Sequence, residues 1–278
     1  MKGGEKMDKK LKYVVLDEEN KNKNFLFSGA YEIFYQINHL NKDQYQQTLV
    51  ISKKRDKLEE AQKANIAVLG VETEPTDSFL PCKLVVERLD LTTAGELNKA
   101  FCREKEIPLI VMETKRLLIR EIEKKDMDAL YQLYQGEEVN DFVDKLHEDR
   151  ELEAAYISDY IRLIYRFYDL GMWMLWDKET GKIIGRAGVE PMEYTGEQVL
   201  ELGYIIGKES RQKGYAREAC EAILEYVKSL EEYQFVDAVI YSGNSISMDF
   251  IKTLGFEIIS EEMKGKKRAQ RWRKILHF

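Results

Sequence analysis

One stretch of the sequence, residues 200–220, joins an apolar run, a basic loop and a helical pattern in that order. The apolar run from Leu200 to Ile206 is rich in β-forming residues and predicts a buried strand. From Ala216 onward, apolar residues recur at three- and four-residue spacing, which predicts an amphipathic helix. A loop between a strand and a helix start favours anion binding, because the first N–H groups of the helix have no partner inside it.

The loop itself adds positive charge and little steric bulk. Gly214 has no Cβ and Ala216 has only a methyl group, so the backbone can approach a phosphate closely. Arg211, Lys213 and Arg217 place cations around the loop. An ordinary surface connection with a basic cluster is the alternative, because short glycine motifs also arise by chance.

Composition limits the classes of function. A length of 278 residues is comfortable for two domains. The net charge of −7 argues against general nucleic-acid binding, so we expect no direct nucleic-acid partner. No apolar run reaches the roughly 18 residues that span a bilayer, and residues 1–10 lack the apolar core of a signal peptide. We therefore expect a cytoplasmic protein without membrane association, whose first ten residues are disordered or tag-like.

Residues 11–112 alternate between strand-like and helix-like patterns, which predicts a small parallel sheet covered by helices on both faces. This is the pattern of a three-layer, Rossmann-like α/β domain. The expected strands are 12–17, 47–52, 66–72 and 83–89, with 107–111 closing the unit, and the expected helices are 30–40, 56–65 and 93–106. Thr92 or Thr93 is the expected cap of the last helix.

Two residues at strand ends give this half a resemblance to haloacid-dehalogenase-type (HAD-like) phosphatases. That family has an Asp nucleophile within Asp-x-Asp after its first strand and a Ser or Thr after its second, and Asp17 and Ser52 stand at the matching places. Glu19 replaces the second Asp, and no acidic pair on a later strand is evident to hold Mg²⁺. Because phosphoryl transfer without the metal loses most of its electrostatic stabilisation, the resemblance implies a degenerate, non-catalytic domain. The alternatives are that Asp17 merely ends a strand, or that phosphatase activity is retained.

Residues 113–278 follow a different pattern, with a strand hairpin near the middle and the anion-binding loop after it. This change of pattern predicts a second domain. The expected strands are 113–122, 171–176, 183–192, 199–206, 234–241, 256–260 and 270–278, and the expected helices are 124–134, 151–168, one beginning at 216 and one within 243–256.

Separated motifs of this half, in the expected order, resemble the GNAT family of N-acetyltransferases. The Arg/Gln-x-x-Gly-x-Gly/Ala signature of the family is matched by Arg211-Gln-Lys-Gly-Tyr-Ala216. Its Asn-x-x-Ser signature, a helix and Leu-Gly-Phe are matched by Asn244-Ser-Ile-Ser247 and Leu254-Gly-Phe256. Thr-x-Arg-Leu-x-x-Arg at 114–120 and Glu-x-Gly-Tyr at 201–204 are similar to the branch that acetylates ribosomal-protein N-termini. The resemblance implies an α+β domain whose mixed, mostly antiparallel sheet is splayed between its central strands.

The resemblance also implies acetyl-CoA as cosubstrate and no metal. The loop would bind the pyrophosphate, and the pantetheine arm would add to the exposed edge of the preceding strand like a short β-strand. An amide N–H of the same strand would hold the thioester oxygen as negative charge develops. The cofactor-binding residues expected from the resemblance are Tyr204, Ile205, Ile206, Arg211, Gln212, Lys213, Gly214, Tyr215, Ala216, Arg217, Asn244, Ser247 and Phe250. For Asn244 and Ser247 the alternative is a helix cap.

Acetylation of an amine needs a base, because an ammonium must lose its proton before it attacks the thioester. Glu201 on the central strand is the first candidate, and Glu190 on the hairpin is the second. A salt bridge from Glu201 to Arg186 or Arg120 is the alternative role.

The resemblance does not assign a proton donor for the leaving thiolate. Many family members have a tyrosine in the late helix, and this chain has Ile251 at the matching place, flanked by Phe250. Ser247 or a water would substitute, or the thiolate would leave unprotonated.

The favoured function is transfer of an acetyl group to a primary amine of a small molecule or protein N-terminus, by direct attack on the thioester. The alternative is a non-catalytic acetyl-CoA sensor, suggested by the missing tyrosine and the degenerate first domain. An acidic cluster at 137–149 would attract a cationic amine, or is a solvated helix face. A basic tail at 264–274 is expected to form a turn and strand edge. Besides acetyl-CoA or CoA and the amine, a second copy of the chain, as a homodimer, is a candidate partner.

Overall fold

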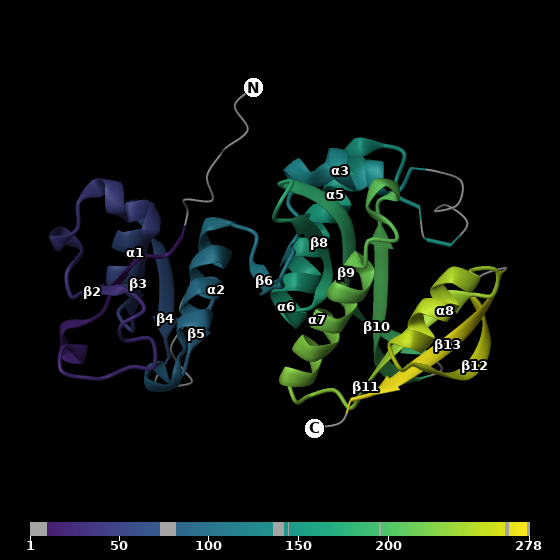
Figure 1. Ribbon diagram of the computed structural model, residues 1–278. Helices are drawn as coiled ribbons and strands as arrows, with labels where there is room; N and C mark the ends of the chain where they lie inside the picture. Colours follow the sequence, from purple (N-terminus) through teal and green to yellow (C-terminus); the bar gives the residue numbers. More distant parts are fainter. Residues whose placement is uncertain are drawn as a thin grey trace. The chain divides into compact units, whose positions relative to one another are not determined.

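The structure is a computed structural model, which describes residues 10–72, 82–135, 142–143, 145–194, 196–264 and 267–276. The chain divides into two compact units, Met1–Leu109 and Ile110–Phe278, close to the division expected between 112 and 113. Each unit has a β-sheet of its own (Figure 1). Among the described helices, none combines the length and the apolar character that crossing a bilayer requires.

The first unit is built on five short strands. These are β1 (Tyr13–Val15), β2 (Glu32–Phe34), β3 (Thr48–Ser52), β4 (Ala67–Val71) and β5 (Val85–Val86). Its helices are α1 (Arg55–Lys63) and α2 (Ala94–Lys105), with the 3-10 turns η1 (Glu18–Asn20), η2 (Ile37–His39), η3 (Lys42–Gln47) and η4 (Leu89–Leu91). The strands pair in the order β2-β1-β3-β4-β5, and every pair is parallel (Figure 1). The prediction of a small parallel α/β sheet is confirmed.

Each face of this sheet has a hydrophobic core. Successive side chains of a strand point to opposite faces, so Leu49 and Ile51 join one core and Val50 joins the other. Phe101 of α2 lies in the first core, and Leu58 of α1 lies in the second. Both faces are therefore covered, which is why the strands of this unit read as continuous apolar runs.

The segment 30–40, expected to be a helix, is instead β2 followed by the 3-10 turn η2. Ile33 packs in the core that contains α2, and Phe34 packs in the core that contains α1. The segment thus buries side chains on two faces at a period of two, which a strand allows and a one-sided surface helix does not.

Other boundaries of the first unit also differ from the expectation. The expected strand 83–89 is reduced to the two residues of β5. The segment 107–111 does not close the first sheet, because it runs into β6 (Ile110–Glu113), which pairs with β7 (Leu117–Arg120) in the second unit. The cap of α2 is Thr93, whose hydroxyl oxygen accepts the N–H of Glu96 at 3.2 Å.

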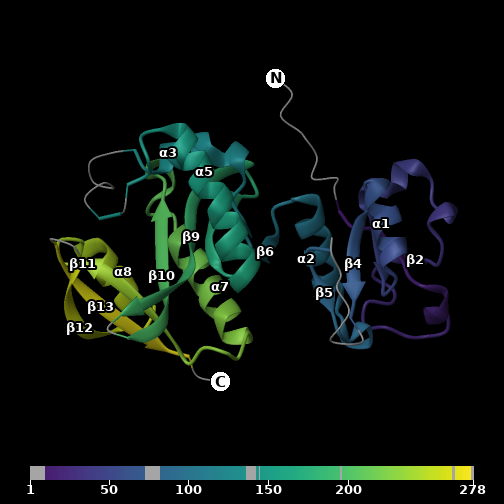
Figure 2. The same ribbon diagram turned by 180° about the vertical axis from the view of Figure 1, so that it is seen from behind.

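The second unit contains the remaining elements. Its further strands are β8 (Gly171–Asp177), β9 (Lys182–Tyr194), β10 (Glu197–Ile206), β11 (Phe235–Tyr241), β12 (Glu257–Lys264) and β13 (Lys267–Ile275). Its helices are η5 (Lys124–Asp126), α3 (Met127–Leu133), α5 (Arg150–Tyr160), the π-helical turn η6 (Ile161–Tyr165), α6 (Arg166–Tyr168), η7 (Lys208–Ser210), α7 (Tyr215–Ser229) and α8 (Ser245–Thr253). The strand order is β12-β13-β11-β10-β9-β8-β7-β6. In Figure 2, β10 lies between β9 and the group of β11, β12 and β13. Only the β10–β11 pair among these described strands is parallel, so the predicted mixed, mostly antiparallel sheet is confirmed.

Helices α5 and α7 cover opposite faces of this sheet. Trp173 faces α7, since its ring meets the Tyr226 ring edge-on at 5.8 Å. Ala187 on β9 is the direct neighbour of Trp173 on β8, so both side chains point to the same face of the sheet. Glu190 is an odd number of residues further along β9 and points to the other face, where Tyr160 of α5 donates a hydrogen bond to it at 2.5 Å.

Strands β10 and β11 are neighbours over only part of their length. β10 pairs with β9 from Glu197 to Ile206, and β11 pairs with β13 from Phe235 to Tyr241. In the described ladder, β10 and β11 pair with each other only at Glu201 and Asp237. Beyond this pair the two strands diverge, and the predicted splay of the central strands is confirmed.

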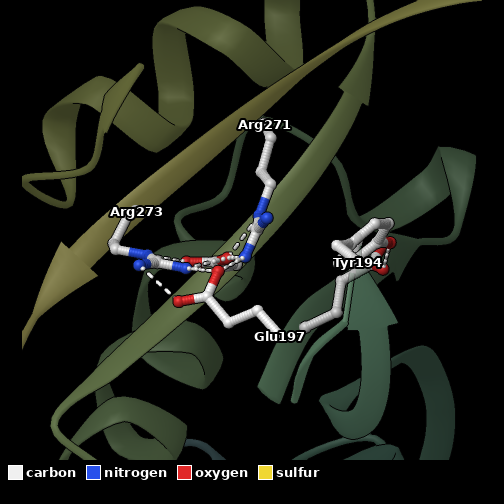
Figure 3. Close-up of polar contacts among 6 residues, drawn as sticks. Tyr194, Glu197, Arg271 and Arg273 are labelled. Atoms are coloured by element: carbon white, nitrogen blue, oxygen red, sulfur yellow. Dashed lines mark hydrogen bonds and ion pairs between the residues drawn. The ribbon is translucent and has the colours of Figure 1, made fainter. Parts of the chain in front are cut away.

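An arginine–carboxylate cluster of Glu197, Asp237, Arg271 and Arg273 joins β10, β11 and β13 beside this pair. Figure 3 labels Glu197, Arg271 and Arg273 of this cluster. Arg271 Nε and Arg273 Nε each donate to Asp237, at 2.6 and 2.7 Å. Both guanidinium groups also bind Glu197, at 2.7 and 2.9 Å. Asp237 is 0% exposed, so its charge depends on these two cations. The cluster therefore fixes the point from which the strands separate.

Replacing Asp237 with Asn would leave the two guanidinium groups without their shared buried counter-charge. We expect Asp237→Asn to lower the free energy of unfolding by about 3–5 kcal/mol, measured by urea denaturation. The control is Asp159→Asn, because Asp159 is 63% exposed in its pair with Arg162 and should contribute less than about 1 kcal/mol. Equal losses in the two variants would contradict the role given to the cluster.

The same cluster gives an expected pH dependence. Hydrogen bonds from Arg273 and Arg271 lower the pKa of Glu197 to about 2. An unfolded Glu titrates near about 4.3, so the stabilisation is present above that pH and is lost as the pH falls toward 2. We expect the stability of the wild-type protein to fall more steeply over this acidic range than that of Glu197→Gln, in urea titrations at several pH values. Parallel pH curves would rule this out.

Candidate active site

A cleft of about 400 Å³ opens where β10 and β11 diverge. The edge of β10 from Glu201 to Ile205 forms one side, and the edge of β11 from Ala238 to Tyr241 forms the other. The rest of the lining comes from α5, from α8 and its N-cap, from the segments 142–143 and 145–147, and from Tyr134, Met172, Arg186 and Glu190. A concave site of this kind, with apolar walls and a few convergent polar groups, is the usual setting for a small-molecule substrate.

The loop between β10 and α7 has the backbone of an anion-binding turn. Gln212 has φ 59° and Gly214 has φ 79°, both in the left-handed region. Gly214 is the N-cap of α7, and no side chain caps this helix end. The N–H groups of the first turn, residues 215–217, are therefore available to an external acceptor. Residues 211–214 are exposed, so the loop is not covered by neighbouring parts of the described structure.

Residues near the start of the second unit contact this loop and the first turn of α7. Arg116 Nη1 donates to Lys213 O at 2.8 Å, and its guanidinium lies 4.2 Å from the centre of the Tyr215 ring. Glu218 accepts hydrogen bonds from the Thr114 hydroxyl and from Arg116 Nε, both at 2.6 Å. Burial alone would raise the pKa of Glu218, but the bonds from Thr114 and Arg116 outweigh burial and hold that pKa below its ordinary value. The Thr-x-Arg motif thus positions the loop.

Helix α8 forms a wall of the cleft. Asn244 Oδ1 accepts the N–H of Ser247 at 3.1 Å, so the helix cap considered as an alternative is present, and both residues also line the cleft. The Tyr204 ring meets the Phe250 ring edge-on at 5.0 Å. Burial raises the pKa of Tyr204, with Ser247 partly opposing the effect, so its hydroxyl stays protonated. Ile251 is fully buried on the same wall and brings no proton donor there.

The two predicted base candidates lie together. Glu190 and Glu201 are paired across β9 and β10, and both line the cleft. Each carboxylate accepts a hydrogen bond from a tyrosine hydroxyl: Tyr160 donates to Glu190 at 2.5 Å, and Tyr194 donates to Glu201. Burial raises the pKa of Tyr160 well above its ordinary value, which keeps this hydroxyl a donor. Because like charges directly opposite on one sheet face repel each other, the pair favours a cation beside it.

The ion pairs considered for Glu201 are not formed with Arg120 or Arg186 among the described contacts. Arg120 instead binds Asp126 through two hydrogen bonds of 2.7 Å. Arg186 lies over the Tyr160 ring, 5.5 Å from its centre.

A histidine that the sequence analysis did not single out also lines the cleft. His147 Nδ1 lies 2.8 Å from Glu153 Oε2, and the backbone N–H of His147 donates to the same oxygen at 3.0 Å. Glu153 is 2% exposed and fixes the orientation of the ring. Because Nδ1 is engaged by Glu153, Nε2 is the ring nitrogen that remains for contact with a ligand. No short motif surrounds His147, and the contact with α5 alone reveals it.

The predicted site residues fall into distinct groups. The cleft gathers Glu190, Glu201, Tyr204, Ile205, Asn244 and Ser247. The loop between β10 and α7 contains Arg211, Gln212, Lys213, Gly214, Tyr215, Ala216 and Arg217, while Ile206 ends β10 and Phe250 lies on α8, all outside the described lining of the cleft. Of the acidic cluster, residues 137, 138, 141 and 144 lie outside the described residues, and Asp149 caps α5 through the N–H of Glu151 at 2.8 Å.

The first unit has a cleft of its own, about 450 Å³, at the carboxyl ends of its strands. The Ser52 hydroxyl donates toward both carboxylate oxygens of Asp17, at 3.0 and 2.9 Å, and Lys57 forms an ion pair with Asp17 at 3.1 Å. Glu19 is paired with Lys53 at 2.8 Å. These bonds favour a structural role for Asp17, and the phosphatase resemblance stays a prediction. Among the described residues, no group of three or more His, Cys, Asp or Glu side chains is arranged to hold a metal ion.

Comparison with known proteins assigns the class of the second unit. Residues 116–257 match the family model described as the acetyltransferase (GNAT) domain, and the chain belongs to this family. Among its relatives, two proteins of Bacillus subtilis and Escherichia coli are named N-acetyltransferases, and the chain is classed as an N-acetyltransferase with them. The GNAT family uses acetyl-CoA, and a CoA complex is among the similar solved structures.

The matched region spans most of the length of several similar proteins. The uncharacterized protein YkkB of Bacillus subtilis is 25% identical over 162 residues, which are 58% of this chain and 89% of that protein. The [ribosomal protein uS5]-alanine N-acetyltransferase of Escherichia coli is 26% identical over 157 residues, 54% of this chain and 80% of that protein. A solved structure of RimL, a ribosomal L7/L12 alpha-N-protein acetyltransferase, has a TM-score of 0.52 at 13% identity and covers 60% of this chain and 94% of its own. The structural likeness confirms the GNAT fold.

The left-handed conformation of Gly214 gives a test of the loop. Gly214→Ala adds a Cβ at φ 79° and should weaken CoA binding about tenfold, because the Cβ strains the turn and narrows the approach to the backbone. Isothermal calorimetry with CoA measures this. Gly181→Ala is the matched control, since Gly181 has φ 64° and no atom within 4 Å of an added Cβ, and lies in the β8–β9 turn. If both variants weaken CoA binding equally, the loop is not the binding element.

Proposed function

We propose that the second unit transfers an acetyl group from acetyl-CoA to a primary amine, which attacks the thioester directly. The observation that carries this proposal is the divergence of β10 and β11, with a cleft between their edges and the anion-binding loop at the end of β10. An exposed strand edge binds an extended, amide-bearing chain as if it were an added strand. The pantetheine arm of CoA is such a chain, and the diphosphate at its end is such an anion.

The cofactor would be held at two places. The N–H groups of residues 215–217 bind the diphosphate, with Arg211 and Lys213 adding positive charge, and Gly214 leaves room for its oxygens. Tyr204, Ile205 and Ile206 offer the β10 edge to the pantetheine arm, and an N–H of this edge stabilises the oxygen of the tetrahedral intermediate. Asn244 and Ser247, at the start of α8, would line the cleft beside the arm, and Phe250 would hold the Tyr204 ring in place.

The carboxylates would handle the proton. Glu201 takes a proton from the ammonium, directly or through a water, and Glu190 is the second candidate for this role. The amine nitrogen then forms a bond to the thioester carbon, the carbon–sulfur bond breaks, and the thiolate of CoA receives a proton from Ser247 or water. The hydroxyls of Tyr160 and Tyr194 hold the two carboxylates in place.

The acceptor is the amine of a small molecule or of a protein N-terminus. The name of the Escherichia coli relative says that it acts on an alanine of ribosomal protein uS5, which supports the second of these classes. The first unit, residues 11–112 in our assignment, would be an appendage without metal-dependent chemistry. An acetyl-CoA sensor without turnover is the second candidate, and the observation that favours it is the buried Ile251 in place of a proton donor.

The catalytic assignment is tested by paired substitutions across the two strands. We expect Glu201→Gln to lower kcat by about 10²–10⁴-fold, because it removes the base, and Glu190→Gln to lower it less. Thiol release from acetyl-CoA in a panel of primary amines measures the rate. Glu225→Gln, at an exposed site on α7, serves as control.

The panel also separates enzyme from sensor. CoA binding without thiol release for any amine favours the sensor, and no CoA binding by the wild-type protein ends the proposal. If Glu190→Gln is the more damaging variant, the roles of the two carboxylates are exchanged.

A further inference from the structure

Arg186 on β9 is a buried arginine that forms no hydrogen bond or ion pair with a carboxylate in the described structure, although Glu190 is near enough to help raise its pKa. The residue is 8% exposed and lines the cleft. Its Nη1 donates a long hydrogen bond to the Tyr134 hydroxyl at 3.4 Å, and its guanidinium lies 5.5 Å from the centre of the Tyr160 ring. Its Nε is buried and has no hydrogen-bond partner. These contacts leave most of the donors of a charged group unused.

Other buried arginines of this unit are neutralised. Arg120, 5% exposed, donates from its two Nη atoms to the two carboxylate oxygens of Asp126, at 2.7 Å each. Arg271, 4% exposed, binds Asp237 at 2.6 Å and Glu197 at 2.7 Å. A buried charge is costly unless an opposite charge accompanies it. Arg186 differs from them because no carboxylate of the described residues accepts its hydrogen bonds. It lines the cleft, where the carboxylate of a ligand can accept them.

The position of Arg186 relates it to the two carboxylates. Arg186 pairs with Ile205, and Glu190 pairs with Glu201, on the same strands. Arg186 and Glu190 are four residues apart on β9 and so point to the same face, about 13 Å apart along the strand. Tyr160 contacts both side chains, since its hydroxyl donates to Glu190 and its ring centre lies 5.5 Å from the Arg186 guanidinium. Glu190 also helps to raise the pKa of Arg186, so the two charges are close enough to interact.

Midway between these positions, β9 and β10 each have a glycine, so neither strand contributes a side chain to the cleft there. Gly188 on β9 pairs with Gly203 on β10. Met172 covers this place, with its Sδ 3.1 Å from where a Cβ of Gly203 would lie. The floor of the cleft therefore has a cation at one end, two carboxylates at the other and an apolar thioether between them.

We propose that the acceptor of this unit is a small amino-carboxylate, whose carboxylate binds Arg186 and whose ammonium lies at Glu190 and Glu201. The inference rests on the proposed acetyl transfer and specifies its substrate. A guanidinium binds a carboxylate through parallel N–H···O bonds, which suits the unused donors of Arg186. A plain amine brings no acceptor for these donors, and the Arg186 Nε stays without a hydrogen bond from the described residues. A protein N-terminus presents an uncharged amide beside its amine, so it offers Arg186 no carboxylate to bind.

The chemical step is unchanged by this assignment. The ammonium gives a proton to Glu201, the nitrogen bonds to the acetyl carbon, and the thiolate leaves and is protonated. The products are an N-acetyl amino-carboxylate and CoA. Acetylation removes the positive charge of the amine, so the product loses its attraction to the two carboxylates, which favours release.

The free protein offers a test that is independent of activity. Arg186→Met removes a buried charge that has no direct ion pair among the described residues, and it should leave the melting temperature unchanged or raise it. Arg120→Met orphans the buried Asp126 and should lower the melting temperature clearly. If Arg186→Met is as destabilised as Arg120→Met, Arg186 has a structural counter-charge and the proposal fails.

Kinetics test the substrate class. The acceptors are free amino acids, each with its carboxamide and its decarboxylated amine, and the readout is kcat/KM from thiol release. We expect the wild-type protein to prefer the carboxylates by at least tenfold, and Arg186→Met to lose that preference while CoA affinity by calorimetry is unchanged. Arg162→Met, at an exposed arginine 59% accessible in its side chain, is the control and should retain the preference.

Each other outcome overturns the proposal. Equal use of carboxylates, amides and plain amines shows that Arg186 does not read the acceptor. Equal loss with every acceptor in Arg186→Met assigns the guanidinium to the thioester oxygen instead. If the protein acetylates plain amines but no amino-carboxylate, small amino-carboxylates are excluded as its acceptor class. Failure of the proposed function is recognised separately, because it appears as absence of CoA binding in the wild-type protein.

Discussion

The buried charge of Asp237 holds together the strands whose separation makes the cleft. Its two arginine partners come from β13, and its backbone partner on β10 is Glu201. The same cluster reaches the proposed base, because Arg271 lies 4.9 Å from the centre of the Tyr194 ring and Tyr194 donates to Glu201. The buried Asp237, bound by two arginines, therefore borders the open part of the sheet.

The sequence predicted those parts of the site that depend on local order. A strand, a glycine and a helix start follow one another within residues 200–220, so the loop and its free N–H groups could be read directly. The cap at Asn244 is also local, since its partner is three residues away. The register of β9 against β10, which places Glu190 opposite Glu201, follows from a hairpin that the sequence also indicated.

Parts of the site made by distant contacts could not be predicted. The buried Glu153 that orients His147 is on a helix whose packing the sequence does not specify. Arg186 was considered only as a partner of Glu201, because nothing local shows that its guanidinium stacks on Tyr160. The error at residues 30–40 has the same origin, since burial on two faces of a sheet is a property of the assembled unit and not of the segment. Asp17 and Ser52 were expected at neighbouring strand ends, but Lys57, which neutralises Asp17, was not.

The bonds of Glu218 to Thr114 and Arg116 have a practical consequence for anyone who divides this chain. The family likeness begins at residue 116, yet the hydroxyl that bonds to Glu218 beside the β10–α7 loop belongs to Thr114, and β6 begins at Ile110. A fragment cut at the start of the likeness would lose an edge strand and one support of the first turn of α7. A cut just upstream of Ile110 would keep both, so the working limits of this enzyme unit extend beyond the part that sequence similarity recognises.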